Sequence, residues 1–192
     1  IPHASIYGDV KYHQVKKIRD ILFTNEQVEA SSPYIETQAL MGSSKSLKGI
    51  YIFGIDAELE KDVSLVSSRL IEGNWESISN EKYGIVIGDF LAFQLGLNLG
   101  DTVNILVPDT SMSIAGLLPR TKRFRVTGIF SIGAPEMDQS FAYINIKNAQ
   151  KLLRIIDSVH GIRIKYKDLF DAPELVREDI KNVNQTLETY LY

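Results

Sequence analysis

The three histidines have the widest chemical range of any side chains in this sequence, because imidazole serves as a metal ligand or as a base near neutral pH. They are His3, His13 and His160. No two of them stand at a metal-ligand spacing such as His-Glu-x-x-His, and the chain has no cysteine to complete a zinc site. We therefore expect surface or structural roles for all three, with no bound metal ion and no other cofactor.

Two acids, Glu136 and Asp138, stand two residues apart in the stretch GAPEMDQS. Paired carboxylates can act as general acid and base, or they can bind calcium. Acids at this spacing are also common in Gly/Pro loops with no catalytic role. We interpret the stretch as a solvated turn.

Two further patterns with possible chemistry are weak. The stretch GSSKSLKG, residues 42–49, is rich in glycine and serine and carries two lysines, but it lacks the residue order of a phosphate-binding loop. It is better explained as a flexible hairpin tip. The chain also has no Gly-x-Ser-x-Gly nucleophile motif. The sequence therefore gives little support to an enzyme.

The segment LVPDTSMSIAGLLPRTKRF, residues 106–124, is the most unusual in the chain. A strand-like run, 101–107, leads in and another, 123–130, leads out, with about fifteen residues between them. Tight hairpins use about two to five residues. The apolar side chains of this connection are Met112, Ile114, Leu117 and Leu118. Either they fold back onto the domain's own sheet, or they form an exposed docking finger.

Basic residues follow the apolar stretch and favour the docking interpretation. They are Arg120, Lys122, Arg123 and Arg125. A charged rim around an apolar centre is a usual interface layout. Burying four apolar side chains contributes about 6–12 kcal/mol, whereas association costs about 4–15 kcal/mol. Such a finger would bind weakly and reversibly, which suits a transfer step.

The composition is that of a globular protein with a substantial core. The chain has 192 residues, 44% of them hydrophobic and 23% charged, and its net charge of -3 argues against nucleic acid as a partner. No apolar run approaches the roughly 18 residues that span a bilayer. The chain starts without methionine and stops within an alternating stretch, so we expect it to be a piece of a longer protein.

The two ends of the chain are predicted to have similar architecture. At the start, a strand (3–8), a helix (12–25) and an extended segment (28–42) follow one another. Near the end, the order is a strand (160–167), a helix (172–183) and a strand (186–192). Such pieces often pair into one sheet with two helices on one face. The middle of the chain would then be an insertion.

The middle is richer in strands, predicted at 47–56, 83–88, 101–107 and 122–130. Residues 57–70 read as partly helical, and 140–155 as a strand followed by a helix. The segment 89–97 reads as a helix capped by Asp89, with Phe90, Phe93 and Leu97 facing inward.

The order of several motifs points to a family. GIDAELEKDVS is followed by YGIVIGDFLAFQLGLNLGDTVNILVPD, then GLLPRTKRFRVTGIF and then GAPEMDQSFAYINIKNAQKLL. This series, over most of the chain, resembles the lipoprotein-releasing ABC transporter permeases, the LolC, LolE and LolF group. The resemblance implies that membrane helices flank this chain, one before it and three after it.

The resemblance also implies the fold, an α+β domain of the MacB-type periplasmic core class. A porter-like subdomain with two βαβ units would comprise 1–46 and 157–192. A β-rich, sabre-like subdomain would comprise 47–156 and carry a protruding β-hairpin.

The implied function is transport and not catalysis. Such permeases lie in the Gram-negative inner membrane with this domain in the periplasm. They release outer-membrane lipoproteins and pass them to the soluble carrier LolA, driven by a cytoplasmic ATPase, LolD. The full complex would contain a LolE-like or second permease subunit.

By position, the resemblance places two LolA-binding elements on this chain. The Hook would run from Pro108 to Pro119, and the Pad would be Asn104, Thr121 and Lys122. The Hook residues are Pro108, Met112, Ile114, Ala115, Gly116, Leu117, Leu118 and Pro119. This chain departs from the LolC pattern in that Ile114 replaces a tip proline and Asn104 replaces a Pad arginine, which removes a bidentate donor. A Gln-Arg pair of the Pad becomes Thr121-Lys122, and the loop is one residue shorter.

Three alternatives stay open from the sequence. The domain could be LolE-like and contact lipoprotein cargo without binding LolA. It could belong to a MacB-type exporter. A hydrolase would be a different class and would require a convergent polar site.

Overall fold

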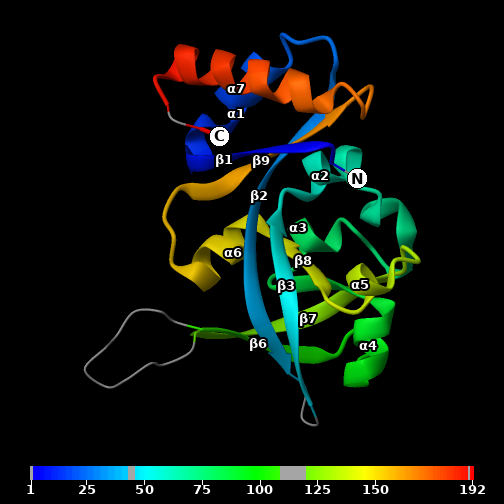
Figure 1. The fold of residues 1–192 in the computed structure, drawn as a ribbon. Coiled ribbons are helices and arrows are strands. Elements are labelled where there is room, and N and C mark those ends of the chain that lie inside the picture. Colours follow the sequence, from blue (N-terminus) through cyan, green and yellow to red (C-terminus); the bar gives the residue numbers. More distant parts are fainter. Residues whose placement is uncertain (1, 43–45, 109–119, 190) are drawn as a thin grey trace.

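The computed structural model describes residues 2–42, 46–108, 120–189 and 191–192. In this part of the chain, nine strands join into one mixed sheet with helices packed on it (Figure 1). The strands are β1 (Ala4–Lys11), β2 (Val28–Gly42), β3 (Leu47–Ile55), β4 (Leu70–Gly73), β5 (Gly84–Gly88), β6 (Thr102–Val107), β7 (Arg120–Phe130), β8 (Phe141–Asn145) and β9 (Ser158–Tyr166). The helices are α1 (Val15–Leu22), α2 (Ala57–Val63), α3 (Ser77–Asn80), α4 (Asp89–Leu95), α5 (Pro135–Asp138), α6 (Ile146–Leu153) and α7 (Ala172–Leu187), with 3-10 turns η1 (Tyr12–Gln14) and η2 (Val66–Arg69).

Six of the strands close into a ring. Strand β2 pairs with β3, β3 with β8, β8 with β5, β5 with β7, β7 with β6, and β6 returns to the end of β2. The β3–β8 and β5–β7 pairs are parallel and the others are antiparallel. Closure leaves these strands without a long free edge, which removes a site of unwanted strand pairing.

Strand β2 also belongs to a second layer. Its first half pairs with β9, and β9 pairs with β1. Helices α1 and α7 lie together over this part of the sheet (Figure 1). The expected strand–helix–strand order at the start of the chain is confirmed, and Val15, Ile18 and Leu22 form the buried face of α1.

The strand expected at 186–192 is wrong. Helix α7 continues to Leu187, and Glu188 ends it with a left-handed backbone, at φ 52°. The Asn184 side chain then forms two hydrogen bonds with the backbone of Leu191, beyond the end of the helix. Its carbonyl accepts from the Leu191 amide at 2.7 Å, and its amide donates to the Leu191 carbonyl at 2.9 Å. Tyr192 exchanges two backbone hydrogen bonds with Tyr7 of β1. A helix-end cap thus replaces the strand.

The orientation expected for the segment 89–97 is confirmed for Leu97, which is buried, and wrong for the two phenylalanines of α4. Phe90 and Phe93 are 47% and 80% exposed, whereas Leu91, Ala92 and Leu95 are buried. The N-cap is Gly88, and the Asp89 carboxylate accepts from the neighbouring Phe90 amide at 2.6 Å. Both sides of this helix are apolar, so periodicity could not choose the buried side.

A second apolar cluster lies beside the main core and is centred on aromatic residues. Trp75 is buried and donates through Nε1 to the Ala57 carbonyl at 2.9 Å. Tyr143 contacts Trp75 and also the rings of Phe53 and Phe130. The cluster comprises Phe53, Ile55, Ala57, Val66, Trp75, Ile78, Val86, Phe130 and Tyr143. It fastens the segment from α2 to α3 onto β3, β8, β5 and β7.

An ion pair is buried between α2 and β9. Glu60 is fully buried, and its Oε1 lies 2.8 Å from an Nη of Arg163. The guanidinium also lies over the rings of Tyr34 and Phe53, at 4.7 and 4.6 Å from their centroids. Burial raises the pKa of the Glu60 carboxyl, and the positive charge of Arg163 opposes that rise.

The solvated turn expected at Glu136 and Asp138 is wrong for the second acid. Glu136 is exposed, but Asp138 is only 5% exposed. Its two carboxylate oxygens accept from the backbone amides of Ile132 and Gly133, each at 2.9 Å. The carboxylate therefore holds the loop between β7 and α5 in place.

Replacing Asp138 by alanine is expected to lower the unfolding free energy by about 1.5–3 kcal/mol, because two buried amides lose a charged acceptor. Urea unfolding followed by circular dichroism measures this change. The matched control is Glu136→Ala, an exposed acid on the same turn, for which a change within about 0.5 kcal/mol is expected. Equal effects of the two substitutions would contradict the role given to Asp138.

Candidate functional site

The hairpin formed by β6 and β7 is the candidate site. The strands pair antiparallel from Thr102 opposite Arg125 to Val107 opposite Arg120. A strand leading into the long connection and another leading out are therefore confirmed. Pro108 is exposed at the end of β6. The other predicted Hook residues lie outside the described residues: Met112, Ile114, Ala115, Gly116, Leu117, Leu118 and Pro119.

The root of the hairpin is firmly held. On one side, β6 pairs with the end of β2, where Leu40 stands opposite Leu106. The side chains of Val103, Ile105 and Val107 are buried. Arg120, the first residue of β7, donates to the Leu153 carbonyl at the end of α6, where a cation also suits the helix dipole. The strands that carry the connection are thus anchored on both the β2 side and the α6 side.

The three predicted Pad residues do not share one face. Asn104 stands opposite Arg123, and Leu106 stands opposite Thr121, so Asn104, Thr121 and Arg123 lie on the same outer face of the hairpin. Both Asn104 and Thr121 are exposed. Lys122 projects to the other side of β7, because neighbouring residues of a strand point to opposite faces. The same alternation, applied to the sequence of β7, could have separated Lys122 from Thr121 and grouped Arg123 with Thr121.

Lys122 has a local partner in Tyr83. Its Nζ lies 4.3 Å from the centroid of the Tyr83 ring. Hydrogen bonding and positive charge from Lys122 lower the pKa of the Tyr83 phenol. Tyr83 also has a left-handed backbone, at φ 60°, and its ring meets Phe124 edge-on at 5.6 Å. These contacts place a basic, aromatic cluster on the inner side of the hairpin root.

An apolar hollow adjoins the start of the long connection. It has a volume of about 370 Å³ and reaches from the β2–β3 pair to Pro108. Leu40 of β2 and Tyr51 of β3, both exposed, lie in it, and Gly49 of β3 stands opposite Leu40. The outer face of the hairpin is therefore continuous with an apolar surface. The polar residues of that face, Asn104, Thr121 and Arg123, lie at one edge of this surface.

The histidines take part in local hydrogen bonds. The Nδ1 of His3 accepts from the Tyr166 amide at 3.2 Å, and that of His160 accepts from the Glu36 amide at 3.1 Å. His13 is bonded to Asp157, and this bond lowers the pKa of the Asp157 carboxyl. Within 2–42, 46–108, 120–189 and 191–192, no three residues of metal-binding type gather. No helix in these ranges has the length and hydropathy to cross a bilayer.

Known proteins resemble this chain over almost its whole length. Residues 4–183 match the model of the MacB-like periplasmic core domain. The chain is 34% identical over 177 residues to the lipoprotein-releasing system transmembrane protein LolC of Xylella fastidiosa strain 9a5c, and 30% identical over 175 residues to LolC of Neisseria meningitidis serogroup B. These matches cover 92% and 91% of this chain but 42% of each relative. The chain thus spans about two fifths of the relatives' length.

Solved structures share the fold at low sequence identity. The extracellular domain of the noncanonic ABC-type transporter YknZ from Gram-positive bacteria has a TM-score of 0.64 at 13% identity, covering 97% of this chain and 95% of that one. The periplasmic region of MacB from Actinobacillus actinomycetemcomitans has a TM-score of 0.62 at 12% identity, covering 98% and 86%. The α+β fold is therefore that of the MacB-type periplasmic core.

Proposed function

Because the chain belongs to the family of MacB-like periplasmic core domains, as the periplasmic domain of a LolC-type permease, we propose that it docks a soluble lipoprotein carrier. The parent would lie in the Gram-negative inner membrane, anchored by helices outside this chain. It would release outer-membrane lipoproteins to LolA, with ATP hydrolysis on a separate LolD subunit and a LolE-like or second permease beside it. The chain itself would have no catalytic role.

The observation that carries this proposal is the anchored β6–β7 hairpin with its long, apolar connection. A docking finger needs a rigid base, because ordering a mobile base on binding would reduce affinity. Here the base is paired with β2 and tied to α6 through Arg120. The connection, with Ile114 and Ala115 as its proposed tip, would enter the carrier as a Hook.

The outer face of the hairpin supports a Pad beside the Hook. Asn104 and Thr121 lie there with Arg123. Arg123 directly faces Asn104 and supplies a guanidinium, the group that binds carboxylates in bidentate fashion. In this proposal Arg123 takes over the function of the arginine that Asn104 replaces. Lys122 would contribute from the inner side, next to Tyr83.

The proposal also includes the two subdomains that the family resemblance implies. Residues 1–46 with 157–192 would form the porter-like part, and 47–156 the sabre-like part that carries the Hook. The close pairing of β1, β9 and the start of β2 supports a unit formed from both chain ends.

Combining Ile114→Asp with Leu117→Asp is expected to weaken binding of the domain to its cognate LolA at least tenfold, because two apolar side chains that the proposal places inside the carrier would be replaced by charges. Titration calorimetry or biolayer interferometry measures this affinity. The matched control combines Ile156→Asp with Phe170→Asp, two side chains that are 90% and 88% exposed elsewhere on the domain. The control is expected to bind LolA like the unmodified domain.

Unchanged LolA affinity in the Ile114/Leu117 variant, with its circular dichroism spectrum intact, would rule out the Hook assignment. Capture of lipoprotein cargo by the unmodified domain, without any LolA binding, would favour the LolE-like alternative instead.

A further inference from the structure

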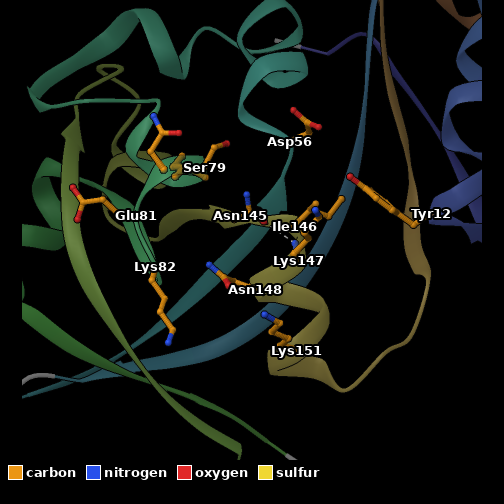
Figure 2. Close-up of a pocket in the computed structure, with 12 residues that line it drawn as sticks. Tyr12, Asp56, Ser79, Glu81, Lys82, Asn145, Ile146, Lys147, Asn148 and Lys151 are labelled. Atoms are coloured by element: carbon orange, nitrogen blue, oxygen red, sulfur yellow. Dashed lines mark hydrogen bonds between the residues drawn. The ribbon is translucent and has the colours of Figure 1, made fainter.

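A polar hollow of about 540 Å³ lies between α6 and the turn that joins α3 to β5 (Figure 2). One wall is the exposed side of α6, and the other is the segment from Ile78 to Lys82. Its lining residues are Tyr12, Asp56, Ile78, Ser79, Asn80, Glu81, Lys82, Asn145, Ile146, Lys147, Asn148 and Lys151. Pro108 and the three proposed Pad residues, the parts of Hook and Pad that the structure describes, are not among the lining residues.

Three lysines converge on it from the two walls. Lys147 and Lys151 are four residues apart on α6, so both project from one face of the helix. Lys82 comes from the opposite wall, and Figure 2 shows its side chain extending toward the same end of the hollow as that of Lys151. Like charges at this helical spacing are mildly unfavourable. Their convergence creates a region of positive potential.

No carboxylate among the described residues neutralises these lysines. Ion pairs between described residues involve His13, Lys61, Arg125, Arg163 and Lys165, and none of them involves a lysine of the hollow. The three ammonium groups of the hollow therefore face solvent with their charge uncompensated by a neighbouring acid. The site is ready to accept an anion without first losing an internal ion pair.

The two acids of the hollow are engaged elsewhere. The Asp56 carboxylate caps α2 and accepts from the amides of Glu58 and Leu59, at 3.1 and 3.4 Å. The Glu81 carboxylate lies 3.9 Å from an Nη of Arg125. In Figure 2 Asp56 lies at the top and Glu81 at the left, and both side chains are directed away from the side-chain ends of Lys82 and Lys151. The lysine end of the hollow is therefore its positive end.

The size and donor types of the hollow indicate the class of ligand. Its volume is large for a single phosphate group and suits several side chains of a peptide. Lysines are flexible point charges that pair with carboxylates in many geometries, and none of the described lining residues is an arginine that could give bidentate recognition. The Asn148 side chain, which lies between Lys82 and Lys151 in Figure 2, adds an amide donor. Clustered carboxylates fit this arrangement best.

The hollow also adjoins the hairpin root. Helix α6 carries Lys147 and Lys151, and its last carbonyl, that of Leu153, accepts from Arg120 at the start of β7. We propose that this hollow, with Lys82, Lys147 and Lys151, is a docking site for an acidic segment of a partner protein. The proposal uses none of the proposed Hook or Pad residues, so it can be tested independently of the proposed carrier docking.

The test uses a fluorescein-labelled hexaglutamate peptide and the 192-residue chain. At about 20 mM salt, where the Debye length exceeds about 20 Å, fluorescence anisotropy is expected to show binding that weakens as salt is raised. Combining Lys147→Glu with Lys151→Glu is expected to weaken this binding at least tenfold. The matched control combines Lys16→Glu with Lys17→Glu on α1, which changes the net charge equally and is expected to bind like the unmodified chain.

Two results would overturn the proposal: no peptide binding by the unmodified chain, or equal weakening by the two charge reversals. Competition identifies the anion. If inorganic phosphate or phosphatidylglycerol vesicles displace the peptide at lower concentration than free hexaglutamate does, the site recognises phosphate and the acidic-segment assignment is wrong. The Ile114/Leu117 variant is expected to bind the peptide normally, which separates this site from the Hook.

Discussion

Replacing Arg163 by methionine is expected to lower the unfolding free energy by about 3–5 kcal/mol, because it leaves the buried Glu60 carboxylate without its counter-charge. Methionine keeps apolar contact with the rings of Tyr34 and Phe53, so the loss reports mainly on charge. Combining Glu60→Leu with Arg163→Met is expected to recover most of the loss, since a well-packed apolar pair of similar volume can replace a buried ion pair.

The stability loss caused by Arg163→Met is expected to depend on pH. Burial already raises the pKa of Glu60, and removal of Arg163 takes away the charge that opposes the rise. A folded-state pKa above the unfolded one means that the folded protein binds the proton more tightly. The variant is therefore expected to lose stability as pH rises from the unfolded pKa of Glu60 through its raised folded pKa. Urea unfolding at about pH 5 and about pH 8 measures this, with the larger deficit expected at pH 8.

The matched control for Arg163 is Lys165→Met on the same strand. Lys165 pairs with Glu29 at 2.7 Å, but Glu29 is exposed, so a cost below about 1 kcal/mol is expected. If Arg163→Met cost no more than Lys165→Met, or if the deficit were larger at acidic pH, the account of the buried pair would be wrong.

Replacing Trp75 by alanine is expected to cost about 3–5 kcal/mol, because it removes the centre of the second apolar cluster and leaves the Ala57 carbonyl without its indole donor. Circular dichroism in urea measures the change. The matched control is Phe93→Ala, an aromatic side chain that is 80% exposed, for which a change within about 0.5 kcal/mol is expected. Equal effects would contradict the packing described for Trp75.

Trp75 also reports on cooperativity, because it is the one tryptophan of the sequence. Strand β3 supplies Ile50 and Ile52 to the main core, and Phe53 and Ile55 to the second cluster. In the unmodified protein, the fluorescence of Trp75 and the far-ultraviolet signal of the whole chain are therefore expected to change at the same urea concentration. Two separated transitions would show that the second cluster unfolds by itself.

The sequence predicted most elements because their patterns are local. The buried strand at β5, the alternating Phe124 and Val126 of β7, and the helix after β8 all follow from apolar spacing. Ring closure was beyond such reasoning, since it depends on pairings between strands distant in sequence, such as β2 with β6. The orientation of α4 was missed because Phe90 and Leu91 are both apolar, and packing alone decides which one is buried.

The candidate site was predictable in its strands and less so in its faces. The two strands of the hairpin were expected, but the opposition of Asn104 and Arg123 follows only from the observed register. The lysine hollow joins Lys82 to Lys147 and Lys151 across the fold. No local sequence pattern connects these positions. They become neighbours because β5, which follows Lys82, pairs with β8, which precedes α6. A buried acid such as Asp138 was missed for a similar reason: its amide partners, though near in sequence, are set by the path of the loop.

The length of β2 has a mechanical consequence. Its 15 residues extend over about 50 Å, pairing with β9 at one end and with β6, at the hairpin root, at the other. A strand that is hydrogen-bonded along its length is stiff against stretching, so it acts as a strut between the two ends of the domain. A tilt of about 5° at the β9 end would displace the far end by about 4 Å, roughly the spacing of two strands. Movement imposed on the β9 end would thus reach the hairpin along β2, together with Ile35, Ala39 and Met41, the side chains that this strand contributes to the core.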